Sequence, residues 1–302
     1  MRDRKAFLTA TAGALALVTG LTAPAEATTA TSDTAAAGVS SRTASALHRD
    51  APAVYGRAAY LMDASSGDVL LDKAGGKRMP IASLTKTMTA YVVLKSAKPT
   101  DVVRITAADV EYAEAGGGTT ADLRPGDRLT VGELLYGLML PSGADAAHAL
   151  ARTYGPGVKG FVAKMNATAR ELGMKDTEYV NADGLPTPRG DGYSTARDQA
   201  VLAAAALKVP LIRKVAGTRR HYLDGNDQHR SYLWRNTNRL IENTDAIGLK
   251  TGFTRAAGYC LAFATERGGR LLVGVLLDES SSSRRFSTAE NLLDWGAAQQ
   301  RA

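Results

Sequence analysis

The chain has 302 residues, 45% hydrophobic and 22% charged, which is the composition of a globular protein with one or two domains. Its single cysteine, Cys260, excludes an internal disulfide and a cysteine metal cluster, and we expect it to be a buried apolar residue. The net charge is +7, but the basic residues are scattered and only 6% of residues are aromatic, which disfavours nucleic acid as a partner.

The first 50 residues predict an export signal followed by a polar leader. A basic start precedes an apolar stretch, and a small-x-small cleavage pattern ends at Ala27. The stretch is short for a helix that spans a bilayer, so we expect cleavage near Ala27 and no stable membrane anchor. Residues 28–50 are rich in Thr, Ala and Ser and would bury too little apolar surface to fold. We therefore expect a signal peptide over 1–27, a disordered leader over 28–50 and a folded domain over 51–302.

Strands are predicted at both ends of the folded part. Residues 55–72 favour two strands around a turn at Ser65–Asp68. Three further strand candidates lie at residues 246–253, 258–266 and 270–278. Gly268-Gly269 predicts a tight hairpin between the last two, and an amphipathic helix is expected over 284–299.

The middle of the chain, about residues 84–240, is predicted to be mostly helical. Apolar residues recur every three to four positions at residues 131–140, 144–155, 160–173 and 196–208. The two sets of strands form one antiparallel sheet only if this middle is an insertion packed against it. The predicted fold class is therefore α/β: an antiparallel sheet of N- and C-terminal strands flanked by helices, with an inserted, mostly helical subdomain. A cleft is expected at their junction.

Ser83 and Lys86 lie three residues apart at the start of a predicted helix whose buried stripe includes Leu84, Met88 and Val92. Side chains at this spacing meet on a helix surface. Burial would lower the lysine pKa and make its amine a proton acceptor for the serine hydroxyl, which would become a nucleophile. Helical N–H groups near the serine would stabilise developing negative charge. Alone the pair is a weak signal, because an N-cap serine and a solvated lysine explain it too.

Two more motifs strengthen this interpretation. Lys250-Thr251-Gly252 falls in a predicted strand, where it would offer a cation, a hydroxyl and N–H groups to a carboxylate-bearing ligand. The glycine lets a ligand backbone approach closely. Ser142-Gly143 occupies a loop tip between two predicted helices, where a helix N-cap is the plainer role for the serine.

Ser-x-x-Lys, Ser-Gly-x and Lys-Thr-Gly, in this order, are the motifs of penicillin-binding proteins and β-lactamases. The chain resembles the low-molecular-mass penicillin-binding proteins of the β-lactamase-like superfamily, which are exported serine-type D-alanyl-D-alanine carboxypeptidases. The resemblance covers roughly residues 52–280 and includes "ASLTKTMTA", "LLYGLMLPSGADAA", "NADGL", "YSTARDQA" and "IGLKTGFTRAAGYCLAFA". It implies a D,D-peptidase domain with a β-lactamase/transpeptidase-like fold, secreted or associated with the cell wall.

The resemblance also implies the catalytic roles. Ser83 would attack the carbonyl between the two terminal D-alanines of a peptidoglycan stem peptide, and Lys86 would take the serine proton. Ser142 would relay a proton to the leaving D-alanine. Water would then hydrolyse the acyl-enzyme, and β-lactams would be trapped on the same serine. No metal and no organic cofactor is needed.

The binding roles follow in the same way. Lys250 and Thr251, with Gly252, would bind the terminal carboxylate of the peptide. The backbone N–H groups of Ser83 and Phe253 would form the oxyanion hole.

One position departs from the family pattern: the middle motif usually ends in asparagine, and this chain has Ala144. Since a methyl group makes no hydrogen bond, we expect altered deacylation or substrate preference. A D,D-transpeptidase with weak carboxypeptidase activity is the alternative.

A class A β-lactamase would need an asparagine four residues after its deacylating glutamate, but Ala182 stands four residues after Glu178. A Ser-His-Asp hydrolase lacks its Gly-x-Ser-x-Gly elbow, and a non-catalytic wall-binding homologue would not need an intact serine and lysines.

Overall fold

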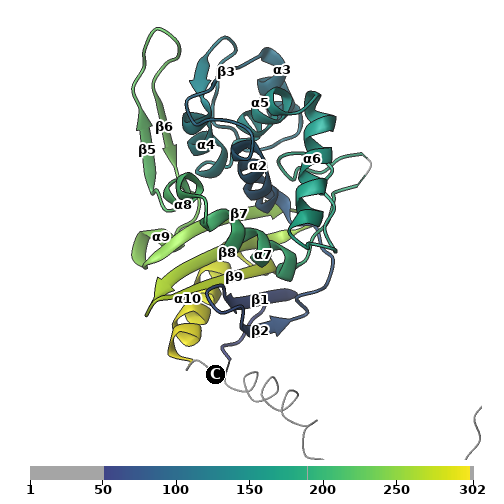
Figure 1. Ribbon diagram of the computed structural model, residues 1–302, viewed down its shortest axis with the longest axis vertical. Coiled ribbons are helices and arrows are strands. Elements are labelled where there is room, and N and C mark those ends of the chain that lie inside the picture. The colour runs from purple at the N-terminus through teal and green to yellow at the C-terminus, as the bar shows by residue number, and fades with distance from the viewer. Residues whose placement is uncertain (1–50, 189, 300–302) are drawn as a thin grey trace, which may run out of the picture. The chain divides into compact units, whose positions relative to one another are not determined.

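The computed structural model describes residues 51–188 and 190–299, so the expected signal peptide and leader lie outside the described residues. A five-stranded antiparallel sheet in the order β2-β1-β9-β8-β7 forms its centre (Figure 1). The strands are β1 (Ala58–Asp63), β2 (Val69–Lys73), β7 (Ala246–Thr254), β8 (Gly258–Arg267) and β9 (Arg270–Glu279). Two strands come from the N-terminal part and three from the C-terminal part, which confirms the predicted α/β fold class.

The hairpin between β8 and β9 forms where the sequence predicts it. Gly268 and Gly269 have φ angles of 57° and 70°. Both are in the left-handed region, which a two-residue hairpin turn requires at both positions and which glycine enters without steric cost. Arg267 and Arg270 pair across the turn, and this pairing sets the register of the two longest strands.

Helices fill most of the chain between β2 and β7. They are the short 3₁₀ turn η1 (Ala82–Leu84), α2 (Thr85–Leu94), α3 (Ala107–Ala115), α4 (Val131–Met139), α5 (Ala144–Tyr154), α6 (Gly157–Glu171), α7 (Ala196–Leu207), α8 (Pro210–Ala216) and α9 (Leu240–Asn243). Two small hairpins interrupt them: β3 (Val102–Arg104) with β4 (Arg128–Thr130), and β5 (Arg220–Leu223) with β6 (Tyr232–Arg235). No described helix is both long enough and apolar enough to cross a bilayer.

Each face of the central sheet buries its own apolar cluster. Along β1, Ala58 and Tyr60 pack on the helical side, whereas Ala59 and Leu61 face α10 (Ser282–Ala298). This alternation is the period of two that a strand imposes on its side chains. α10 packs under β8 and β9, while α7 covers the opposite face (Figure 1). The sheet is thus buried on both sides.

Helix α2 is more deeply buried than the sequence indicates. The predicted stripe places Leu84, Met88 and Val92 in the core, and all three are buried. However, Thr89 on another face is buried as well, because α4, α5, α6 and α7 surround the helix. The Thr89 hydroxyl donates to the carbonyl of Ala182 at 2.6 Å. A threonine whose hydroxyl is hydrogen-bonded in this way can be buried in a core, although the apolar pattern of the sequence does not reveal it.

Candidate active site

The three sequence motifs meet at a cleft of about 290 Å³ between η1, the outer edge of β7 and the turn that joins α4 to α5. This volume is close to the lower end of the range for small-molecule sites. The residues that line it are Ser83, Lys86, Gly117, Gly118, Thr119, Pro141, Ser142, Leu185, Thr237, Thr251, Gly252, Phe253 and Arg285. Lys250 does not line it and lies behind this wall, buried.

The side chains of Ser83 and Lys86 are in direct contact. The Lys86 amine lies 3.0 Å from Ser83 Oγ and donates to the carbonyl of Asp183 at 2.9 Å. Only 1% of Lys86 is exposed. Burial lowers its pKa to about 8, although the negative charges of Asp183 and then Asp145 act to raise it. A substantial part of the amine is therefore uncharged just above neutral pH, and an uncharged amine accepts a proton.

Ser83 lies in the 3₁₀ turn η1, directly before α2, rather than inside the α-helix. The preceding residue, Ala82, has a φ angle of 48°, which is strained for a residue with a side chain. Such strain persists where the surroundings hold it, often at functional sites. A Cβ on Gly252 would lie 2.9 Å from the carbonyl oxygen of Ile81 and 3.2 Å from Ser83 N. The glycine therefore lets η1 lie against β7.

The Lys-Thr-Gly motif places a buried amine and a hydroxyl next to the cleft. The Lys250 amine donates to the Thr251 carbonyl at 2.9 Å. Burial, followed by the charges of Lys86 and Arg285, holds the pKa of Lys250 well below its ordinary value. The hydroxyls of Thr251 and Thr237 are 2.7 Å apart at the cleft wall. An anion placed here would find donors and relieve the repulsion among the cations.

Arg285 is a cleft residue that the sequence analysis missed. It comes from α10, is 7% exposed, and donates to the carbonyls of Gly252 at 3.0 Å and Cys260 at 3.3 Å. Its Nε is buried without a hydrogen-bond partner in the described part of the chain. Only its place at the start of the predicted last helix was visible in the sequence, and nothing there indicates that the guanidinium reaches through to the cleft.

Ser142 reaches the cleft from the turn between α4 and α5. Its φ angle is 69°, it is 6% exposed, and its Oγ has no hydrogen-bond partner among the described residues. Ala144, two residues later, is fully buried and does not line the cleft. A Cβ on Gly118 would lie 3.1 Å from the Ala144 methyl. The position of the usual asparagine is thus covered by a loop, so the cleft wall has no open gap there.

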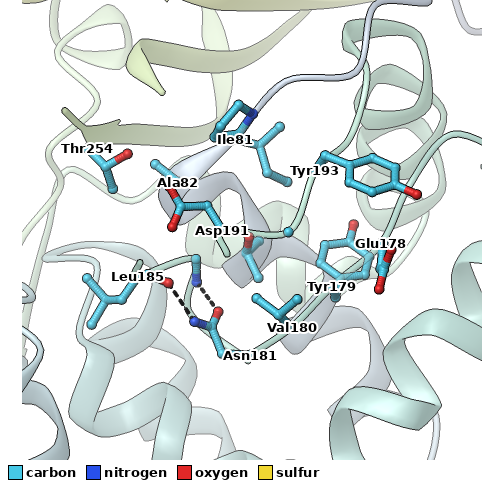
Figure 2. Close-up of a pocket in the computed structure, with 14 residues that line it drawn as sticks. Ile81, Ala82, Glu178, Tyr179, Val180, Asn181, Leu185, Asp191, Tyr193 and Thr254 are labelled. Carbon is cyan, nitrogen blue, oxygen red and sulfur yellow. Dashed lines mark hydrogen bonds between the residues drawn. The ribbon is translucent and has the colours of Figure 1, made fainter. Parts of the chain in front are cut away.

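A second hollow, of about 20 Å³, adjoins η1 beyond Ala82 and Thr254 (Figure 2). It is far smaller than the cleft. Figure 2 shows that the Asn181 side chain bonds across its own loop to two consecutive residues: it donates to the Leu185 carbonyl at 2.7 Å and accepts from Gly184 N at 2.7 Å. The braced loop is the one whose Asp183 carbonyl holds the Lys86 amine.

The geometry does not support the hydrolytic rivals. Glu178, the glutamate considered for a β-lactamase, lines the small hollow and not the cleft. No histidine of the described chain lines the cleft, as a Ser-His-Asp hydrolase would require. Within residues 51–188 and 190–299, no group of three or more His, Cys, Asp or Glu residues is placed to hold a metal ion.

Comparison with known proteins gives a consistent answer. The family described as D-alanyl-D-alanine carboxypeptidase matches residues 45–281. A D-alanyl-D-alanine carboxypeptidase of Streptomyces sp. is 38% identical over 260 residues, which cover 82% of this chain and 89% of the relative. The carboxypeptidase DacF of Bacillus subtilis is 36% identical over 80% of this chain, which spans only 62% of that relative's length.

Solved structures agree. The crystal structure of a Streptomyces DD-transpeptidase superposes with a TM-score of 0.78 at 38% identity, covering 82% of this chain and 99% of that one. A D-alanyl-D-alanine carboxypeptidase from Mycobacterium tuberculosis gives 0.77 at 32% identity, covering 83% and 94%. From the motifs, the cleft and these similarities together, we conclude that the chain belongs to the D-alanyl-D-alanine carboxypeptidase family of serine penicillin-binding enzymes.

Proposed function

We propose that the protein removes the terminal D-alanine from peptidoglycan stem peptides through an acyl-enzyme on Ser83. The observation that carries this proposal is the 3.0 Å contact between Ser83 Oγ and a buried lysine amine whose pKa is lowered to about 8. Family membership supports the substrate class, because the related enzymes are named for the D-alanyl-D-alanine bond. β-Lactams would acylate the same serine.

Acylation needs a base and a site for the oxyanion. Ser83 Oγ attacks the peptide carbonyl carbon while its proton passes to the Lys86 amine. The backbone N–H groups of Ser83 and Phe253 are our candidates for the oxyanion hole, since η1 packs against β7 at this point. When the C–N bond breaks, Ser142 Oγ protonates the leaving amine and regains a proton from Lys86. Water attacking the ester then restores Ser83.

The terminal carboxylate would bind at the cationic end of the cleft. Thr251 and Thr237 provide hydroxyl donors there, and the Arg285 guanidinium provides positive charge. A bound carboxylate would also raise the lowered pKa of the buried Lys250 and so favour its charged form. With these four residues at the site, we expect peptides with a free C-terminal carboxylate to react faster than their amides, because an uncharged end would leave the cationic groups without a counter-ion.

A D,D-transpeptidase with weak carboxypeptidase activity is the second candidate. One observation favours it specifically: the similar Streptomyces structure is that of a DD-transpeptidase. In that case an amine, rather than water, would take the acyl group from Ser83. Mass spectrometry of the products from diacetyl-Lys-D-Ala-D-Ala, with and without added glycine, separates the two: a shortened peptide indicates hydrolysis and a glycine adduct indicates transfer.

We also propose that the chain acts outside the cytoplasm, as its N-terminal pattern predicts. Sequencing the N-terminus of secreted material tests this, and a first residue of Thr28 is the expected result.

Replacing Ser83 by Ala tests the nucleophile. The variant should lose all covalent labelling by a fluorescent penicillin, because no other hydroxyl in the cleft contacts the Lys86 amine. Ser66→Ala, in the exposed turn between β1 and β2, is the matched control and should label like the unaltered protein. Labelling of Ser83→Ala at another residue, located by peptide mass spectrometry, would refute the assignment.

A further inference from the structure

Ser142 has a backbone conformation that is unfavourable for a serine. Its φ angle of 69° is in the left-handed region, which is strained for a serine. Its Oγ makes no hydrogen bond in the described chain that would fix the side chain. Contacts to the backbone around Ser142 must therefore hold the residue in this conformation at the cleft wall.

Thr119 supplies these contacts from the loop after α3. Its hydroxyl donates to the carbonyl of Ser142 at 2.8 Å, and its own carbonyl accepts from Ala144 N at 2.8 Å. One residue thus bonds the turn on both sides of Gly143. Thr119 itself lines the cleft.

Two neighbouring features keep the Thr119 loop against this turn. The buried Asp145 carboxylate accepts the N–H groups of Ala121 at 2.8 Å and Leu123 at 3.1 Å, so it ties the same loop to the start of α5. The close packing of Gly118 on the Ala144 methyl allows the loop to approach. A longer side chain at position 144 would crowd Gly118 and push the loop away.

We propose that Thr119 is a positioning residue that holds Ser142 in its strained conformation, and that the small side chain of Ala144 is what allows this contact. The proposal rests on the role of Ser142 proposed above, as the group that protonates the leaving D-alanine. It gives the alanine at position 144 a function of its own: the loop contacts orient the serine in a chain that lacks the usual asparagine.

The role of Ser142 concerns the proton that the leaving group receives. In acylation by a peptide, the C–N bond breaks and the amine takes a proton from Ser142 Oγ, so a displaced hydroxyl slows the step. In acylation by the matching ester, with D-lactate in place of the last D-alanine, an alkoxide of lower basicity leaves and depends less on that proton. A misplaced Ser142 should therefore slow the amide far more than the ester.

The experiment compares amide and ester acylation rates in Thr119→Val, Thr119→Ser and Thr120→Val. Thr119→Val keeps the shape and removes the hydroxyl, and it should slow the amide roughly tenfold with less than about a twofold effect on the ester. Thr119→Ser restores the hydroxyl and should restore the ratio. Thr120→Val makes the same change one residue away, where the residue is exposed and does not line the cleft, and should leave the ratio unchanged.

Ser142→Ala and Ala144→Asn complete the set. Ser142→Ala should show the selective loss in full, and Ala144→Asn should show part of it because the loop is pushed away.

Equal amide-to-ester ratios in Thr119→Val and the unaltered protein, with a selective loss in Ser142→Ala, would overturn the inference alone. An unselective loss in Ser142→Ala would overturn the role of Ser142 and the inference with it, while failure of the unaltered protein on both substrates would refute the proposed function. Thermal unfolding and penicillin-labelling stoichiometry correct each rate for the folded fraction, and Thr119→Ala replaces the valine variant if that one is unstable.

Discussion

Two groups of buried basic side chains in this protein have different hydrogen-bond partners. At the end of β1, the Arg270 guanidinium donates to Asp63 Oδ2 at 2.6 Å and to the carbonyl of Gln299 at 2.8 Å. At the cleft, Lys86 on its wall and Lys250 behind that wall are just as buried, but their amines bond to a hydroxyl and to backbone carbonyls, and no carboxylate of the described residues is in hydrogen-bond contact with them.

The difference separates a structural pair from a reactive group. An arginine paired with a carboxylate keeps its proton and stabilises the native state only if the pair stays intact. A buried lysine without such a partner has its pKa lowered and becomes a base, at a cost in stability. The three predictions below test this contrast.

Replacing Lys86 by Met should have the largest effect. Methionine fills a similar volume without an amine, so acylation by labelled penicillin should slow by roughly 10²- to 10⁴-fold, the usual range for a lost general base. Thermal unfolding should occur at the same or a higher temperature, since a buried cation has been removed. Lys208→Met, at an exposed position after α7, is the matched control. A large loss of stability in Lys86→Met would mean that the lysine is structural.

Breaking the Asp63–Arg270 pair should lower the stability and leave acylation unchanged. Asp63→Ala leaves the guanidinium buried and unpaired, and should cost about 3–5 kcal/mol of unfolding free energy in urea titrations. The double change Asp63→Leu with Arg270→Met should recover most of this loss. Neither variant should alter the acylation rate of the folded molecules, because β8 and β9 separate β1 from β7. A slower acylation in folded Asp63→Ala would show that the two charge groups are coupled.

The pH dependence of acylation and of stability should distinguish Lys86 from Asp63, with a smaller effect than either substitution. Below pH 8 the Lys86 amine gains a proton, so acylation should slow tenfold per pH unit and level off above pH 8. Stability should rise between pH 8 and 10.5, because the unfolded lysine still binds the proton that the folded one has released. For Asp63, burial acts to raise the pKa but Arg270 lowers it below 3.8, so its contribution is present above that pH and lost in acid. An acylation limb near pH 10 would contradict the assignment of Lys86.

The strands and long helices were predictable from the sequence, whereas several short elements were not. β8, β9 and their Gly268-Gly269 turn follow from apolar runs and turn chemistry, and α4 to α7 follow from periodicity. α3 was missed because its buried side chains are Asp109 and Ala113, which form no apolar stripe. Its start is marked by Thr106, which bonds with Asp109 in a capping box, a signal that could have located it.

The candidate site shows the same division. Ser83, Lys86 and Lys250 could be identified from the sequence because reactive groups recur in fixed local motifs. Arg285 and Thr119 could not be found in this way, since each reaches the cleft through the packing of an element remote in sequence. The burial of Ala144 under Gly118 is likewise a tertiary fact, and the local motif suggested only a missing amide.

The position of β7 has a consequence for solubility. A nine-residue strand at the border of a sheet invites edge-to-edge association with a second molecule. Here η1, α8 and α9 pack against β7 and shield much of that border. Of β7, Thr251, Gly252 and Phe253 line the cleft, so under the proposed function an extended peptide bound there would lie along this border of the sheet, as an added strand does.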